Sequence, residues 1–350
     1  PPPLHSSAAS DVYKRQVNSQ NFTLQVSTVS NSFGGSDKET IESIRTTAPF
    51  QYATQNRAVT AEDYATLTQR NFGSLLKDIS SFGGEDALEP EFGVIFLSLL
   101  FSDAVENDTV SGEAIKQATK DSVVNLFKDL SVASFDIKFT DPIISFIETN
   151  VFFQFNPNLT TLTENTIKDN VQNTVAQYFT DNTGKFKQSF RRSNLLTLID
   201  ALSPAILSSR MEVKMQRRFT PTLTAIQNHT LRYPQNIADT DDVNFRVTST
   251  PFTSGGKTCI VRNRLNSNVL EVFDTVNAEV IVDNVGSYAT DTVSIVGLQI
   301  DAIPSGDTFI KVSVVPENQS FVTPLRQDVL NHDVSNSLVE VVEVDTNVLN

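Results

Sequence analysis

The sequence predicts an α+β multidomain protein, with small α/β modules that place helices on a mixed sheet, followed by a β-sandwich or barrel-like C-terminal domain. Three observations indicate this fold class. The 350-residue length is enough for two or three domains with real cores. Helical periods alternate with β-rich runs as far as residue 221. From Thr222 onward the helical periods fade, and short β-rich runs recur between turn signals.

The first 16 residues look like translated adapter sequence rather than native protein, because there is no initiating Met before the run SSAASDVYKRQ at residues 6–16. We therefore expect the native chain to begin upstream of Val17, and the chain to be a C-terminal fragment. Residues 17–32 are interpreted as the end of a truncated N-terminal domain. Phe22 and Leu24 alternate with polar residues there, which predicts a half-buried strand.

Residues 33–102 are predicted to form one compact module. Ser36 and Glu39 make a capping box, so a short helix should begin near Asp37. Pro49 biases the residue before it away from the α region and is expected to end this helix.

A second helix of the same module is predicted to follow the cap formed by Thr60 and Asp63 and to end at Gly73. Strands are expected at residues 75–82 and 93–101, joined by an acidic, glycine-containing loop at residues 83–90. The apolar face of the helix is expected to comprise Ala61, Tyr64, Ala65 and Leu67.

Three segments of this module resemble the baseplate J-like family, wedge proteins of contractile phage tails that include the inner-ring wedge proteins of T-even-like phages. The segments are ETIESIRTTAPF at residues 39–50, QNRAVTAEDYATL at residues 55–67, and Gly83-Gly84 followed by acids, a proline and a strand. The resemblance implies a virion structural protein of the tail baseplate, made in the host bacterial cytoplasm. It further implies that the protein dimerises, binds other wedge proteins in the inner baseplate ring, and relays the host-contact rearrangement to sheath contraction. A wedge protein of a phage-derived injection or secretion machine fits the same motifs.

A second α/β module is predicted at residues 111–221, after an acidic linker at residues 102–110. Helices are expected at residues 113–130, at 164–180, and at 195–202 after a Ser193-Asn194 cap; strands are expected at 135–139, 143–155 and 206–219. The first helix should bury Ile115, Ala118, Ser122, Leu126 and Leu130, and the second Ile167, Val171, Val175, Tyr178 and Phe179.

The region of residues 222–350 is predicted to be a β-rich domain. Asn266-Ser267-Asn268 is expected to form a hairpin turn, and residues 321–337 a polar arm or loop. The predicted strands are residues 244–249, 258–265, 269–272, 279–282, 293–300, 309–315 and 338–344.

Composition argues against several classes of function. The formal net charge of −14 disfavours nucleic-acid binding, which needs clustered Lys and Arg. No apolar run approaches the ~20 residues that span a bilayer, so we expect no membrane insertion. Cys259 is the only cysteine, so the chain forms no internal disulfide.

The motifs that could support catalysis or ligand binding are weak. His5 lies in the suspected adapter segment, and neither His229 nor His332 has a carboxylate or cysteine at metal-ligand spacing. Gly255-Gly256-Lys257-Thr258 ends like a phosphate-binding loop, but Pro251 occupies the first glycine position, so a hairpin turn is expected. The acids at residues 85–91 and 239–242 lack the Ca²⁺-loop pattern and are interpreted as solvated or protein-contact loops. We predict a non-enzyme with no catalytic residue, cofactor, metal site or small-molecule substrate.

Basic residues stand out on this acidic chain as candidates for partner binding: Arg57, Arg191, Arg192, Lys214, Arg217 and Arg218. The last five bracket one α/β element and could form a docking surface for an acidic neighbour. The alternative is ion pairing with acids of the same chain. For Arg57 the alternatives are a local pair with Glu62 or Asp63 and a contact between subunits.

The main alternative function is that of a carbohydrate-binding or adhesive virion protein, based on the β-rich half. It would require an exposed aromatic patch, for which Phe252, Phe273, Tyr288 and Phe309 are available. A tail-associated glycan hydrolase is a third possibility.

Overall fold

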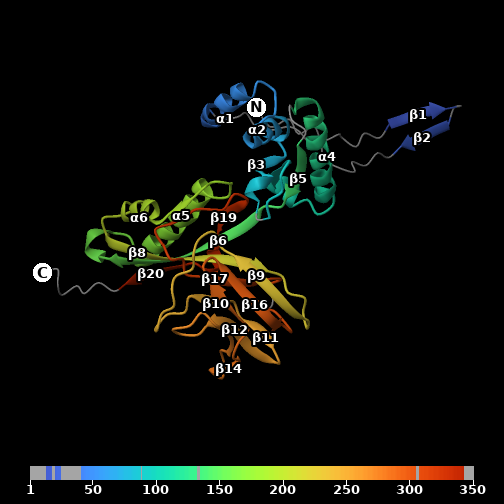
Figure 1. The fold of residues 1–350 in the computed structure, drawn as a ribbon. Helices are drawn as coiled ribbons and strands as arrows, with labels where there is room; N and C mark the ends of the chain where they lie inside the picture. The colour runs from blue at the N-terminus through green and yellow to red at the C-terminus, as the bar shows by residue number, and fades with distance from the viewer. Residues whose placement is uncertain are drawn as a thin grey trace. The chain divides into compact units, whose positions relative to one another are not determined.

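The structure is a computed structural model that describes residues 13–17, 20–24, 41–87, 89–131, 135–304 and 307–342 (Figure 1). It divides into two compact units, residues 1–141 (unit 1) and residues 142–350 (unit 2). Helices on a mixed sheet, followed by a β-rich region, confirm the predicted α+β multidomain class. No helix in the described part of the chain is long and apolar enough to cross a bilayer.

Unit 1 begins with an antiparallel hairpin of β1 (Tyr13–Val17) and β2 (Gln20–Leu24). Part of the predicted adapter segment therefore pairs with the following strand, while residues 1–12 lie outside the described residues. The helices are α1 (Ile41–Thr54), α2 (Ala61–Phe72), α3 (Asp103–Glu106) and α4 (Gly112–Leu130), with a 3-10 turn, η1 (Gly84–Asp86). The sheet has the order β3-β4-β5, from β3 (Leu76–Gly83), β4 (Val94–Phe101) and β5 (Asp136–Thr140).

The capping box of α2 is confirmed. The Thr60 side chain accepts from the Asp63 backbone N–H at 3.4 Å, and the Asp63 carboxylate accepts from the Thr60 N–H at 2.8 Å. The helix ends at Gly73 as expected, but Gly73 has φ −59° and is not a left-handed cap. Glycine is required there for space, because an added Cβ would lie 2.5 Å from the Gln69 carbonyl oxygen.

The predicted end of the first helix at Pro49 is wrong, since α1 continues through Pro49 to Thr54. Proline disfavours the α region for the preceding residue without forbidding it, and it removes one helix hydrogen bond. The chain instead leaves the helix at Gln55 and Asn56, which have φ values of 47° and 57°. The predicted start near Asp37 lies outside the described residues.

The core of unit 1 forms where α2 and α4 pack on the sheet. Tyr64 of α2 is fully buried, and its ring centroid lies 4.5 Å from that of Phe127 on α4. The buried row of α4 is Thr119, Val123 and Phe127, so Ala118 and Ser122, which were predicted to be buried, are exposed. Ile115, Leu126 and Leu130 of the predicted row are partly buried and pack against the same core, so only the centre of the buried face differs from the prediction.

Unit 2 combines helices with a long sheet. Its helices are α5 (Glu164–Asn182) and α6 (Arg192–Asp200), with 3-10 turns η2 (Pro157–Leu159) and η3 (Val334–Asn336). The strands are β6 (Ile143–Phe155), β7 (Phe190–Arg191), β8 (Ile206–Phe219), β9 (Ile226–Arg232), β10 (Val247–Ser249), β11 (Phe252–Ser254), β12 (Lys257–Asn263), β13 (Leu270–Asp274), β14 (Glu279–Val282), β15 (Gly286–Ala289), β16 (Thr292–Gln299), β17 (Ile310–Val314), β18 (Phe321–Val322), β19 (Asp328–His332) and β20 (Leu338–Val342).

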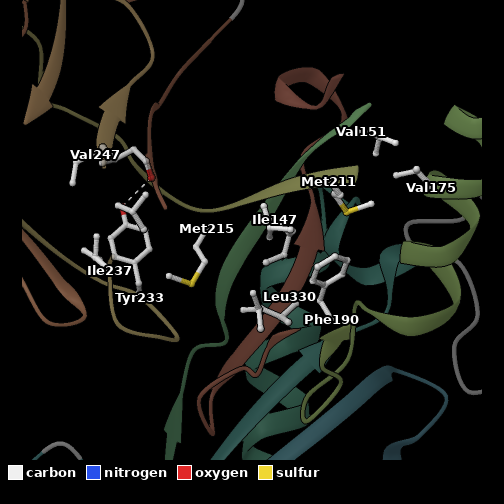
Figure 2. Packing of buried hydrophobic residues seen from close by; sticks show 14 of the residues in the cluster. Ile147, Val151, Val175, Phe190, Met211, Met215, Tyr233, Ile237, Val247 and Leu330 are labelled. Atoms are coloured by element: carbon white, nitrogen blue, oxygen red, sulfur yellow. Dashed lines mark hydrogen bonds between the residues drawn. The ribbon is translucent and has the colours of Figure 1, made fainter. Parts of the chain in front are cut away.

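A ten-stranded sheet runs through unit 2 in the order β14-β13-β12-β10-β17-β8-β6-β19, with β11 on β12 and β20 on β6. The antiparallel β6 and β8 pair from Phe146 with Gln216 to Phe155 with Ile206. All five residues predicted for the buried face of α5 are buried. In Figure 2, Ile147 of β6 and Leu330 of β19 lie near Phe190, and Met215 of β8 lies between Ile147 and Tyr233.

Each predicted strand of the β-rich region overlaps an observed strand, although β10 begins only at Val247 and residues 343–344 lie outside the described residues. A three-stranded sheet of β15, β16 and β9 shares one core with the long sheet. Gly255 and Gly256, with φ values of 56° and 75°, form the β11–β12 turn, as expected in place of a phosphate loop. The predicted polar arm at residues 321–337 is wrong, because it contains β18 and β19.

The predicted domain limits at residues 102–110 and near residue 221 remain predictions. The acidic run at 102–110 forms α3 and turns inside unit 1, where Val105 is buried with Val123. The long sheet contains strands from both sides of residue 221, because β17 pairs with β8 while β19 and β20 pair with β6.

The predicted Ser193-Asn194 cap is displaced, since α6 already begins at Arg192.

Candidate functional site

The predicted basic candidates on β8 lie on opposite faces of the long sheet, because successive strand residues alternate. Arg217 is 5% exposed, and its Nη2 lies 2.7 Å from Oδ2 of Asp328 on β19. Its Nε donates to the Arg232 carbonyl at 2.7 Å. Ser145 of β6 donates to the same Asp328 oxygen at 3.2 Å. Intramolecular pairing thus accounts for Arg217.

The Arg217–Asp328 pair leaves one polar atom of each side chain without a hydrogen bond among the described residues. Among the described residues, Arg217 Nη1 and Asp328 Oδ1 have no hydrogen-bond partner. Burial raises the pKa of Asp328, and the charge of Arg217 opposes that shift. Removing one member of such a pair leaves the other as an uncompensated buried charge.

On the other face, Asp333 organises a second cluster. Its Oδ2 lies 2.8 Å from Nζ of Lys311 and 3.3 Å from Nη2 of Arg218, and it accepts from Gln216 at 2.6 Å. Burial opposes ionisation of Asp333, but hydrogen bonds from Lys311, Ser335 and Gln216 outweigh it and lower its pKa to about 2.

Two further contacts complete this cluster. The Arg218 guanidinium lies over the Phe146 ring at 3.4 Å and near the Phe309 ring at 4.7 Å. The buried Glu148 accepts from Gln216 and Ser313. Burial lowers the pKa of Arg218. The structure therefore pairs Arg217 with Asp328 on one face of the sheet. On the other face it groups Arg218 with Lys311, Asp333 and Glu148. Sequence reasoning missed these four partners.

The remaining basic candidates are placed separately. Arg191 is exposed at the edge where β7 pairs with β18, and Arg192 donates from Nη1 to the Met211 carbonyl at 3.3 Å. Lys214 is half-buried and lies opposite Glu148 in the sheet register. In unit 1, Arg57 is exposed and donates to Gln55 at 3.1 Å.

Neither histidine of unit 2 lies in a metal-binding group. His332 stacks on Phe179 with ring centroids 4.1 Å apart, and its Nε2 is 2.9 Å from the Ser337 hydroxyl. Burial lowers the pKa of His332 to about 4. His229 stacks on Phe219 at 3.9 Å, and burial lowers its pKa too. In the part of the chain that the structure describes, no three His, Cys, Asp or Glu residues gather as a metal site.

An open polar cavity of about 870 Å³ lies in the β-rich region. Tyr288 contributes to its wall, and the Tyr288 hydroxyl, with a pKa raised by burial, has no hydrogen-bond partner among the described residues. The wall also includes Asn236, Asp239, Thr240, Asn266, Asn268, Thr290 and Glu317. These side chains offer hydrogen-bonding groups and negative charge rather than apolar area, as a polar contact surface does.

Comparison with known proteins gives two matches in chain order. Residues 60–138 match the C-terminal domain I of the baseplate structural protein gp6, and residues 143–218 match its C-terminal domain III. The chain is 29% identical over 184 residues to the baseplate wedge protein gp6 of Enterobacteria phage T4. That match covers 53% of this chain and 26% of the T4 protein, so the chain spans about a quarter of its relative.

The matched segments agree with the structure. Domain I corresponds to α2 through β5 in unit 1, and domain III corresponds to β6 through β8 in unit 2. Over these two segments the chain is therefore similar to two C-terminal domains of a phage baseplate structural protein.

Proposed function

We propose that the chain is a baseplate wedge component, related to the baseplate J-like proteins, that dimerises and binds other wedge subunits in the inner ring. In this role it relays the host-contact rearrangement to sheath contraction and performs no covalent chemistry. The proposal rests on one observation: two consecutive segments match two gp6 domains, and each lies within a compact unit with a continuous apolar core. Rigid modules of this kind suit a switching assembly, because packed cores move as bodies.

Self-association is tested by light scattering during gel filtration of the full chain over a range of concentrations. A dimer of the 38.6 kDa chain is expected. A stable homodimer buries about 2,000 Å² or more, so its mass should hold on dilution. A monomer at every concentration would contradict the dimer, while co-elution with purified wedge subunits of the same phage would test the remaining contacts separately.

The four aromatic side chains that the adhesive alternative requires do not form an exposed patch. Phe252 is fully buried and Tyr288 is 5% exposed. Phe273 and Phe309 lie beneath the guanidinium groups of Arg262 and Arg218, at 3.4 and 4.7 Å. Binding and degradation assays on host surface glycans test the adhesive and hydrolase alternatives, and a wedge protein should be inactive in both.

A further inference from the structure

Phe92 is one of the most exposed large apolar side chains among the described residues of unit 1. It lies in the loop between β3 and β4 and is 84% exposed. Phenylalanine is among the residues most often buried, and aromatic residues are enriched at protein interfaces. Neither matched domain assigns it a role.

The residues on both sides of Phe92 are tied to β5, Glu91 by its side chain and Gly93 by its backbone. Glu91 forms an ion pair with Lys138 of β5, and the Gly93 carbonyl accepts from the Asp136 backbone N–H at 3.0 Å. Phe92 is therefore presented from two anchored neighbours, which reduces the entropy lost when it binds.

Two glycines, Gly84 and Gly93, stand at the two ends of the same loop, where the backbone favours glycine. The Glu91 backbone N–H donates to the Gly84 carbonyl at 2.9 Å. A Cβ on Gly84 would lie 1.8 Å from the Glu91 carbonyl oxygen, so only glycine fits. Gly93 has φ +78°, which also favours glycine.

The loop that carries Phe92 is also rich in acidic residues. Glu85 and Glu89 are exposed on it, and the Glu91–Gly84 hydrogen bond brings its two ends together. Glu91 pairs with Lys138 of β5. The Phe92 tip, defined as Glu85, Glu89, Glu91 and Phe92, therefore combines one apolar side chain with three acidic residues of the same loop.

We propose that the Phe92 tip docks into an apolar pocket rimmed by Lys or Arg on a different baseplate subunit. Charge complementarity favours a partner other than a second copy, because Arg217 and Arg218 of this chain are already paired with Asp328 and Asp333. The inference rests on the proposed wedge function and adds the docking residue and the chemistry of the partner surface.

The test uses the full chain mixed with the purified wedge proteins of the same phage. Phe92→Ala should weaken the complex at least about tenfold, as expected for a central aromatic contact. Tyr52→Ala is the matched control, since Tyr52 is 85% exposed on α1 of the same unit and should leave affinity unchanged. The double change Glu85→Lys and Glu89→Lys should weaken binding and reduce its dependence on salt.

The occupant is identified with p-benzoylphenylalanine at position 92 and, as a control, at position 52. The expected crosslink joins position 92 to apolar residues flanked by Lys or Arg on another protein. Crosslinks to a second copy or to unit 2 of the same chain, or none above the control, would overturn the inference. If wild-type chain binds and Phe92→Ala binds equally, this inference alone fails; if wild-type chain binds no wedge protein, the proposed function fails.

Discussion

At the residue scale, the basic candidates separate into buried and exposed groups. Arg217 and Arg218 differ by one position, yet one side chain reaches Asp328 and the other Asp333. Each acid is more than 100 residues away in the chain, in a segment that sequence reasoning treated as a polar arm. The alternation along β8 could have separated the two arginines, but nothing in the sequence indicated that β19 would supply the carboxylates.

The first prediction concerns the Arg217–Asp328 pair. Asp328→Ala should lower the free energy of unfolding by about 3–5 kcal/mol, because it leaves a buried guanidinium unpaired. Glu212→Ala is the control, since the Arg210–Glu212 pair is exposed and should change stability by less than about 1 kcal/mol. Denaturant unfolding measures both. Equal effects of the two substitutions would contradict the assignment of Asp328 to a buried pair.

The second prediction concerns His332, whose folded pKa of about 4 lies below the ordinary 6.5. The unfolded chain takes up a proton as pH falls below 6.5, whereas the folded chain does so only near pH 4. Stability should therefore fall between these values, by up to roughly 3 kcal/mol. His332→Phe retains a ring against Phe179 and should lose this pH slope. An unchanged slope in denaturant titrations would show that other groups cause it.

At the element scale, much of the fold follows from local sequence. The α2 cap follows from a short local motif. The buried face of α5 and the alternating burial of Met211, Val213 and Met215 in β8 follow from the period of apolar residues. The errors occurred where tertiary contacts override local preference. The helix α1 passes through Pro49, and α4 turns its Val123 row inward. Short strands such as β18 and β19 exist only because distant partners pair with them.

The third prediction tests the α2 cap. Thr60→Ala should destabilise unit 1 by about 0.5–2 kcal/mol, because the Asp63 N–H loses its side-chain acceptor. Thr174→Ala on α5 serves as control; its hydroxyl donates to the Asn170 carbonyl of its own helix, and a change within ~0.5 kcal/mol is expected. Hydrogen exchange at the first turn of α2 should rise in the first variant only. Protection equal to wild type there would contradict the role of the cap.

At the scale of the whole molecule, the domain III match covers only part of the sheet to which it belongs. Residues 143–218 supply β6 and β8, while β17, β19 and β20 come from the rest of the chain. The β-rich region therefore completes the matched module, and both share one core. Separate folding of the two parts would leave the edges of β6 and β8 unpaired.

The fourth prediction follows from this shared sheet. A fragment of residues 142–350 should unfold in one cooperative transition, whereas residues 142–221 should aggregate or lack a transition, since they lose three pairing strands. Thermal unfolding followed by circular dichroism distinguishes them. A soluble, cooperatively folded 142–221 fragment would instead support the domain limit predicted near residue 221.

The central claim, a wedge component of a contractile-tail baseplate, is tested most directly by locating the chain in the virion. Immunogold electron microscopy of intact particles, with an antibody raised against residues 142–350, makes that measurement. We expect label at the distal end of the tail, in the baseplate. Label on fibre tips would favour the adhesive alternative, and label on the capsid or sheath, or an unlabelled particle, would contradict the wedge assignment.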